Sequence, residues 1–182
     1  MKAREIVLPL SPDVVAELRV GVEVELFGRV LTGRDQACAR LCEMLQQGRE
    51  LPVDLEGQLL YFVGPSPARE GEVVGAAGPT TSGRMNPFLP IFLERGLRGF
   101  IGKGYVSHKV KEALVEHNGV YLGAIGGTGA LLSAAIEAVE VVAFEELLSE
   151  AVHCMKFNRF PAVVLNDCCG GDLYESARGK RV

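Results

Sequence analysis

The stretch at residues 75–104 constrains the fold more than any other part of the sequence. Residues 72–77 are mostly apolar and predict a short buried strand, which ends in a turn at Gly78-Pro79. Asn86, followed by a proline, is typical of a helix start, and Gly96 is placed to end that helix. Residues 97–101 are apolar again and predict a second strand. A strand–loop–helix–strand unit makes a parallel crossover, so its loop should lie at the carboxyl edge of a sheet.

This unit contains several polar side chains that are suited to binding an anion. Thr80, Thr81 and Ser82 supply hydroxyl groups, Arg84 supplies a guanidinium, and Lys103 follows the second strand between two glycines. Together with backbone amides that glycines leave accessible, these donors suit a small anion, most simply a carboxylate. The alternative is a polar turn beside a solvated lysine, and the residues alone leave both interpretations open.

A second arginine occupies a comparable position. Residues 22–31 alternate apolar and polar side chains and predict a strand, after which Thr32-Gly-Arg-Asp leads into a helix that closes at Gly48. Arg34 is therefore expected at a helix amino terminus, where its charge opposes the helix dipole. A bound anion would offset that cost, and a salt bridge to Asp35 or to another neighbouring residue is the alternative.

The rest of the chain shows further strand and helix patterns. Ser11 and Ser107 are expected to cap helices. A glycine-rich loop at residues 126–129 precedes a small-residue helix at 130–138, and we interpret the loop as close helix–strand packing, with phosphate binding as the alternative. Residues from 176 onward are interpreted as a frayed basic tail. Other strands are expected at residues 5–8, 58–63, 120–124 and 139–144, with a final hairpin or strand pair at 151–157 and 162–165.

Length and charge limit the possible functions. The 182 residues are long enough to bury a core, and we expect one α/β domain over residues 1–182 with its core at about 5–175. A net charge of −4 without a basic run argues against nucleic acid as a partner. The sequence shows no signal peptide and no run of membrane-spanning length, so we expect a cytoplasmic protein without a membrane partner.

Metal-ligand and disulfide patterns are weak. The five cysteines are an odd number and show no C-x-x-C spacing, which argues against a disulfide framework and against a metal or iron–sulfur site built by this chain alone. Cys38 and Cys42 are interpreted as small apolar fillers, whereas Cys168 and Cys169 stand in a turn where an exposed thiol is possible. The three histidines are scattered and are interpreted as surface or packing residues.

Two motifs carry a family resemblance. Gly-Pro-Thr-Thr-Ser-Gly-Arg-Met at residues 78–85, followed by Gly-Lys-Gly at 102–104, resembles the beta subunit, or C-terminal domain, of class I iron–sulfur hydro-lyases. That family includes fumarases and L(+)-tartrate dehydratases, and its Thr-x-Arg-Asp stretch is matched at residues 32–35. The chain departs from the family pattern at Cys38, where the family usually has His, at Asn86, where Asp is common, and in the turn at 166–172.

The resemblance implies a swivelling β/β/α fold and an enzyme half-site. By motif, Arg34, Thr80, Arg84 and Lys103 match substrate-contacting positions, with Thr80 at the position of the proposed proton-transfer threonine. The family's 4Fe-4S cluster is bound by an alpha subunit, so this chain is expected to bind no metal and to work in a hetero-oligomer of alpha2beta2 type. The implied substrate is a small dicarboxylate, with fumarate/malate ahead of tartrate/oxaloacetate. A non-catalytic carboxylate-binding or scaffold module of the same fold is the alternative.

The residue types agree with that chemistry. A guanidinium grips a carboxylate with two parallel hydrogen bonds, which suits Arg34 and Arg84 to holding a dicarboxylate. Lys103 is suited to neutralising the charge that develops as a proton leaves carbon. Thr80 is the candidate for proton transfer, although a hydroxyl needs a partner that lowers its pKa, and the sequence offers no obvious one. We therefore assign Thr80 and Lys103 as catalytic candidates, and the arginines, with the neighbouring hydroxyls of Thr81 and Ser82, as substrate-binding candidates.

Overall fold

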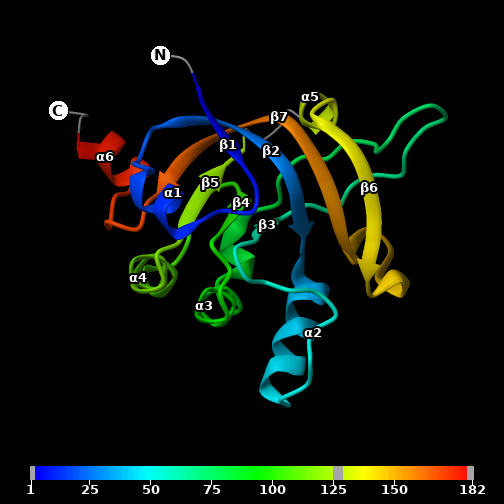
Figure 1. Ribbon diagram of the computed structural model, residues 1–182, viewed down its shortest axis with the longest axis horizontal. Helices are drawn as coiled ribbons and strands as arrows, with labels where there is room; N and C mark the ends of the chain where they lie inside the picture. Colours follow the sequence, from blue (N-terminus) through cyan, green and yellow to red (C-terminus); the bar gives the residue numbers. More distant parts are fainter. Residues whose placement is uncertain (1–2, 125–128, 180–182) are drawn as a thin grey trace.

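The sheet is built from seven strands within residues 3–124 and 129–179, the part of the chain that this computed structural model describes. The strands are β1 (Arg4–Val7), β2 (Glu23–Thr32), β3 (Leu59–Tyr61), β4 (Gly99–Gly102), β5 (Val120–Gly123), β6 (Ile136–Ala143) and β7 (Val152–Asn166). Their order is β1-β2-β3-β4-β5-β7-β6, with β1 to β5 parallel and β7 antiparallel to β5, β6 and also β2 (Figure 1). The expectation of a single mixed α/β domain with parallel crossovers is confirmed.

The helices follow the predicted capping residues in two places. Ser11 accepts a hydrogen bond from the backbone N–H of Val14 (3.3 Å), and Ser107 accepts one from that of Val110 (3.4 Å). Helices α2, α3 and α4 lie side by side below the sheet in the view of Figure 1. The helical elements are α1 (Pro12–Glu17), α2 (Asp35–Gln46), α3 (Leu89–Glu94), α4 (His108–Glu116), α5 (Gly129–Ser133) and α6 (Leu173–Gly179), with 3-10 turns η1 (Ser82–Met85) and η2 (Glu145–Glu150).

Both faces of the central parallel strands β3, β4 and β5 are buried, which explains their continuous apolar sequences. Leu59 and Tyr61 face a core that β7 completes with Phe157 and Phe160. Leu60, between them, faces a second core, which includes the inner faces of α2, α3 and α4. Because side chains alternate along a strand, one short strand serves two cores.

The first strand of the predicted crossover lies elsewhere. Residues 72–77 form no strand; they belong to a projecting excursion in which the Ser66 N–H donates to the Ala76 carbonyl (3.0 Å) and the Gly75 N–H to the Ser66 carbonyl (3.2 Å). Backbone groups of this segment therefore form hydrogen bonds with one another. The Tyr61 hydroxyl fixes the end of the segment by donating to the Ala77 carbonyl (2.5 Å). Strand β3 takes the predicted place, since it pairs directly with β4.

The C-terminal half differs from its prediction in three ways. The helix expected at residues 130–138 ends at Ser133, and strand β6 begins at Ile136. The expected hairpin at 151–165 is one continuous strand, β7, in which Arg159 has a left-handed φ of 57°. Residues 158–161, which have the composition of a turn, stay within the strand because Phe160 and Pro161 pair with β2, and the register of this pairing shifts next to Arg159.

The C-terminal residues also form structure where a frayed tail was expected. Residues 173–179 make α6, whose first turn is capped by Asp172 Oδ1, which accepts from the Glu175 N–H (3.0 Å). Most of the glycine-rich loop at 126–129 lies outside the described residues. Within the described ranges, no helix is long and apolar enough to cross a membrane.

Candidate functional site

The carboxyl ends of the parallel strands meet at one edge of the sheet. The register places Thr32 opposite Tyr61, Tyr61 opposite Ile101 and Ile101 opposite Leu122, so the residues that follow each strand emerge together. Arg34 follows β2 and Lys103 follows β4 at this edge. The predicted site residues therefore belong to neighbouring strand ends.

The loop at residues 80–84 docks onto these ends through its backbone. The Thr80 N–H donates to the Phe62 carbonyl (2.7 Å), directly after β3. Thr81 forms an isolated parallel bridge with Lys103, and the Ser82 N–H donates to the Lys103 carbonyl (2.9 Å). Thr80 is half-buried, whereas Thr81 and Lys103 are exposed. The structure thus brings the hydroxyl loop and the lysine together, as the crossover predicted.

Ser82 does not face the surface. Its side chain is fully buried, and its hydroxyl lies 2.9 Å from the hydroxyl of Tyr121, which is also 2.8 Å from the Gly104 carbonyl. Burial raises the pKa of Tyr121, so the phenol stays protonated and able to donate. A Cβ at Gly102 would lie 2.0 Å from Ser82 Oγ, so glycine is needed there. The expected substrate contact of Ser82 is therefore replaced by a structural one, because the hydroxyl is already enclosed.

Arg84 joins η1 to the start of α2. Its Nη2 lies 3.2 Å from Oδ2 of Asp35, and the two side chains are 49% and 38% exposed. The sequence placed Asp35 beside Arg34, as a possible partner of that residue. The structure pairs it instead with Arg84, which draws the two predicted arginines to the same helix end.

Arg34 is held more tightly, as the N-cap residue of α2. Its side chain is 24% exposed and packs over Gly64, where a Cβ would lie 2.5 Å from Nη1. Its Nη2 is 3.5 Å from Oε1 of Glu150, while its Nε is buried without a hydrogen-bond partner in the described structure. The other oxygen of Glu150 accepts the Gln36 N–H (3.0 Å) at the amino end of α2. Glu150 therefore accepts one N–H at the helix end and pairs with Nη2 of Arg34, while Nε of the arginine stays without a partner.

Sequence reasoning missed Glu150 and Gly64. Glu150 ends η2, far from Arg34 in the chain, and no spacing pattern links the two residues. Gly64 stands in a proline-rich turn, where a glycine needs no further explanation. Only the three-dimensional arrangement reveals that both shape the surroundings of Arg34.

A buried pair lies at the end of β2, beneath this region. The Thr32 hydroxyl accepts from the backbone N–H of His153 (2.9 Å) and lies 3.3 Å from the ring Nδ1 of the same residue. Burial lowers the pKa of His153, against a smaller opposing effect of its hydrogen bond to Ala151. His153 is therefore a packing histidine, as its isolated place in the sequence suggested.

The cysteines do not suit an iron–sulfur cluster. Cys38 and Cys42 lie in the core on α2, and burial raises the pKa of both thiols, which disfavours the thiolate that metals require. Cys154 lies on β7, and Cys168 and Cys169 lie in the turn after it. Among the described residues, no three His, Cys, Asp or Glu side chains are grouped to hold a metal ion. Cysteines so placed cannot form a three-thiolate site.

Comparisons with known proteins give a consistent result. A family model described as "Fumarase C-terminus" matches residues 2–177. "Fumarate hydratase 1, mitochondrial" from Leishmania major is 37% identical over 169 residues, which are 90% of this chain and 31% of the relative. "Fumarate hydratase class I, anaerobic" from Escherichia coli K12 is 34% identical over 174 residues, which are 93% of this chain and 32% of the relative.

A third relative has a length similar to that of this chain. "Putative L(+)-tartrate dehydratase subunit beta" from Methanocaldococcus jannaschii is 35% identical over 177 residues, covering 94% of this chain and 91% of the relative. The chain therefore spans less than a third of the two fumarate hydratases but most of this subunit.

Proposed function

Because the chain belongs to the Fumarase C-terminus family, we propose that it supplies half of the active site of a hydro-lyase acting on a small dicarboxylate. The observation that carries the proposal is the meeting of the 80–84 loop with Lys103, and of Arg84 with the helix that begins beside Arg34. Arg34 and Lys103 follow the ends of β2 and β4, and Arg84 lies in η1 beside them, so this edge carries three cations, which suit a doubly charged anion.

In this proposal each residue has a separate task. Arg34 and Arg84 bind the two carboxylates and fix the orientation of the carbon chain. Lys103 stabilises the negative charge that develops on a carboxylate when the neighbouring carbon loses its proton. Thr80 transfers that proton, and Thr81 contributes a hydroxyl contact at the open side of the loop. In the reverse direction, the same groups hold the unsaturated dicarboxylate while water adds.

Activation of the substrate hydroxyl is assigned to a partner. We propose that an alpha subunit binds the 4Fe-4S cluster and covers this edge in a hetero-oligomer of alpha2beta2 type. The beta-subunit name of the Methanocaldococcus relative supports that division. The exposure of Lys103 and Arg84 agrees with it, because charge interactions gain strength when a partner excludes water. The swivelling β/β/α architecture that the family resemblance implies for this domain is part of the same proposal.

Fumarate/malate is the favoured substrate pair, and L-tartrate/oxaloacetate is the next. The test is anaerobic co-expression of the chain with a candidate alpha subunit, followed by assays on fumarate, malate and both tartrates. Thr80→Val should lower kcat by about 10²–10⁴-fold, the usual contribution of a positioned proton-transfer group. Affinity for a competitive dicarboxylate inhibitor should change less than about twofold, because the arginines remain.

The non-catalytic alternative makes a different prediction. A carboxylate-binding or scaffold module would bind the inhibitor through the arginines, yet the assembled complex would neither hydrate fumarate nor dehydrate malate or either tartrate. Near-normal kcat in Thr80→Val would remove Thr80 from the mechanism while leaving the half-site proposal in place.

A further inference from the structure

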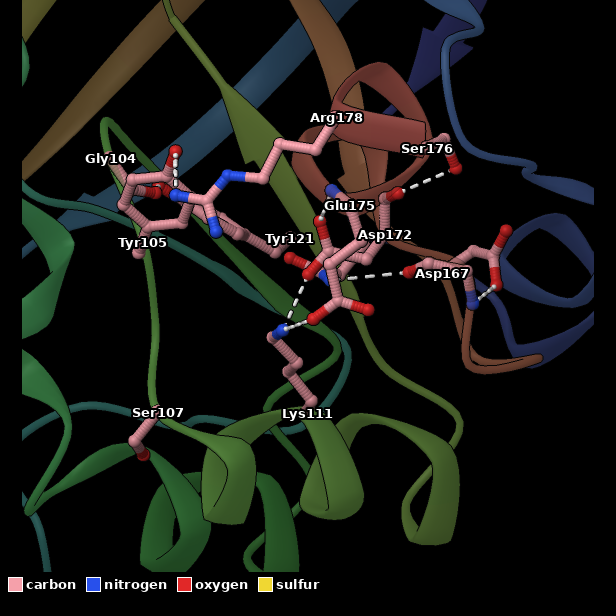
Figure 2. A network of polar contacts seen from close by, with 12 residues as sticks. Gly104, Tyr105, Ser107, Lys111, Tyr121, Asp167, Asp172, Glu175, Ser176 and Arg178 are labelled. Atoms are coloured by element: carbon pink, nitrogen blue, oxygen red, sulfur yellow. Dashed lines mark hydrogen bonds and ion pairs between the residues drawn. The ribbon is translucent and has the colours of Figure 1, made fainter. Parts of the chain in front are cut away.

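The residue two positions after Lys103 is held by the C-terminal helix. The ring of Tyr105 lies 4.5 Å from the ring of Tyr174, centroid to centroid. The guanidinium carbon of Arg178 lies 5.1 Å from the Tyr105 ring centre, and its Nη2 donates to the Tyr105 hydroxyl (3.1 Å), as Figure 2 shows. Tyr174 and Arg178 of α6 therefore both contact Tyr105, which lies in the turn that carries Lys103.

Helix α6 is in turn fixed to α4. Lys111 Nζ lies 2.6 Å from Asp172 Oδ2 and 2.7 Å from Glu175 Oε1 (Figure 2). Asp172 is only 6% exposed, so this ion pair is shielded from water on one side. Burial alone would raise the pKa of Asp172, but the bonds from Lys111, the Glu175 N–H and Asn166 outweigh it and lower that pKa. The start of the helix is thus anchored, while Arg178 reaches back from its last turn.

The opposite face of the same turn rests on the 80–86 region. Tyr121 contacts the Gly104 carbonyl, and the Ser107 N–H donates to Asn86 Oδ1 (3.0 Å). Gly104 has a φ of +80°, a conformation that a side chain would strain. The Lys103 turn therefore lies between a buried support on the loop side and an exposed support on the α6 side.

We propose that Tyr105, Tyr174 and Arg178 are positioning residues that fix the backbone of the Lys103 turn, and through it the ammonium group. The consequence for turnover rests on the proposed hydro-lyase function; the fixing of the turn does not. The ammonium of a lysine is carried by a flexible four-carbon chain, so the position of the ammonium depends on a fixed Cα position. Misplacement of a charged group by about 1 Å is enough to cost a large factor in rate.

The first test uses the chain alone and amide hydrogen exchange. Arg178→Ala and Tyr105→Leu should each accelerate exchange at residues 103–107 by about tenfold, because the turn then opens locally. Exchange in β3, β4 and β5 should stay unchanged. Arg49→Ala is the matched control, since Arg49 is exposed and has no side-chain partner among the described residues. Exchange at 103–107 equal to that control would overturn the proposal.

The second test measures kinetics in the assembled complex. Arg178→Ala and Tyr105→Leu should each lower kcat by about tenfold with KM within twofold. The conservative variants Arg178→Lys and Tyr105→Phe should each lose much less than the corresponding disruptive variant, because each keeps part of the contact. Equal losses in Arg49→Ala, or loss through KM alone, would contradict a positioning role. If the wild-type complex has no hydratase activity, the proposed function fails, whereas the exchange result still decides whether α6 fixes the turn.

Discussion

Arg34 and Arg84 approach the same sheet edge from differently built surroundings. Arg34 packs over Gly64 and beside Glu150, with side chains that are 24% and 17% exposed in that pair. Arg84 pairs with Asp35 at the surface, where the exposed fractions are 49% and 38%. A surface ion pair contributes about 0–1 kcal/mol, so Arg84 exchanges its partner readily. The difference teaches that the fold encloses the side chain of Arg34 and leaves that of Arg84 in an exposed ion pair.

Conservative replacement of the two arginines should show the largest contrast. Arg34→Lys should lower kcat/KM of the assembled complex by about 100-fold or more, because it loses the two-pronged grip and leaves Glu150 with a poorer partner. Arg84→Lys should lower it by about ten- to a hundred-fold, the equivalent of one charge-assisted hydrogen bond of roughly 1.5–3 kcal/mol. The measurement is kcat/KM with the thermal midpoint as control, and equal losses would erase the proposed contrast.

Glycine substitutions should separate the same two regions next. A Cβ on Gly64 would meet Arg34 Nη1 at 2.5 Å and Arg34 Cδ at 2.9 Å, whereas one on Gly83 meets only the Tyr105 carbonyl at 3.4 Å and the Asn86 amide at 4.0 Å. Gly64→Ala should therefore displace Arg34 and reduce dicarboxylate affinity by about tenfold, at a stability cost of about 1–3 kcal/mol. Gly83→Ala should change stability by less than about 1 kcal/mol. Calorimetric titration and thermal denaturation of both variants test the pair.

Neutralising the acidic partners should have smaller effects. Glu150→Gln should destabilise the chain by about 1–2 kcal/mol, because a half-buried arginine loses its charged partner. Asp35→Asn should cost about 0.5 kcal/mol or less, since its pair is exposed and screened. Urea unfolding at two salt concentrations distinguishes them, because salt should weaken only the exposed pair. A larger cost for Asp35→Asn would contradict the assignment of Arg34 as the enclosed residue.

Acid should affect the Lys103 side of the edge through Asp172, with the smallest expected change. The pKa of Asp172 is lowered in the folded chain, so its contribution to stability is fully present above its ordinary pKa of about 3.9 and is lost as the pH falls through the lower folded value. Thermal midpoints between pH 6 and pH 3 should fall less steeply in Asp172→Asn than in the wild type. If the thermal midpoints of the wild type and of Asp172→Asn fall equally with pH, protonation of Asp172 does not destabilise the fold, and this prediction is wrong.

What the sequence predicted well was local. Strands β3 to β5 are buried on both faces, so their apolar runs are visible in the sequence, and β2 shows its alternation of apolar and polar residues. The caps Ser11 and Ser107 act within a few residues. The meeting of Thr81 with Lys103 was predicted because loops of parallel crossovers lie at the carboxyl edge of a sheet, although the first strand of that crossover is β3 and not residues 72–77. These features depend on neighbours in the chain.

What the sequence missed depends on distant pairing. Asn158-Arg-Phe-Pro has the composition of a turn, yet the pairing of Pro161 with Glu25 of β2 keeps it within strand β7. Glu150 contacts α2 across more than a hundred positions, and α6 is stabilised by Lys111 of another helix. The same distance effect enclosed Ser82, because nothing in its own loop reveals Tyr121 above it.

The late position of β7 in the sequence has a consequence for folding during synthesis. Strands β2 to β5 are complete by Gly123, but β7, which pairs with both β2 and β5, ends only at Asn166. A ribosome adds roughly 5–20 residues per second, so the parallel strands wait several seconds for the strand that joins them. During that interval the apolar face of Leu26, Leu59 and Leu122 lacks its cover of Phe157 and Phe160. Nascent chains stalled before residue 152 should therefore recruit chaperones that bind exposed apolar segments, and chains released after residue 166 should not.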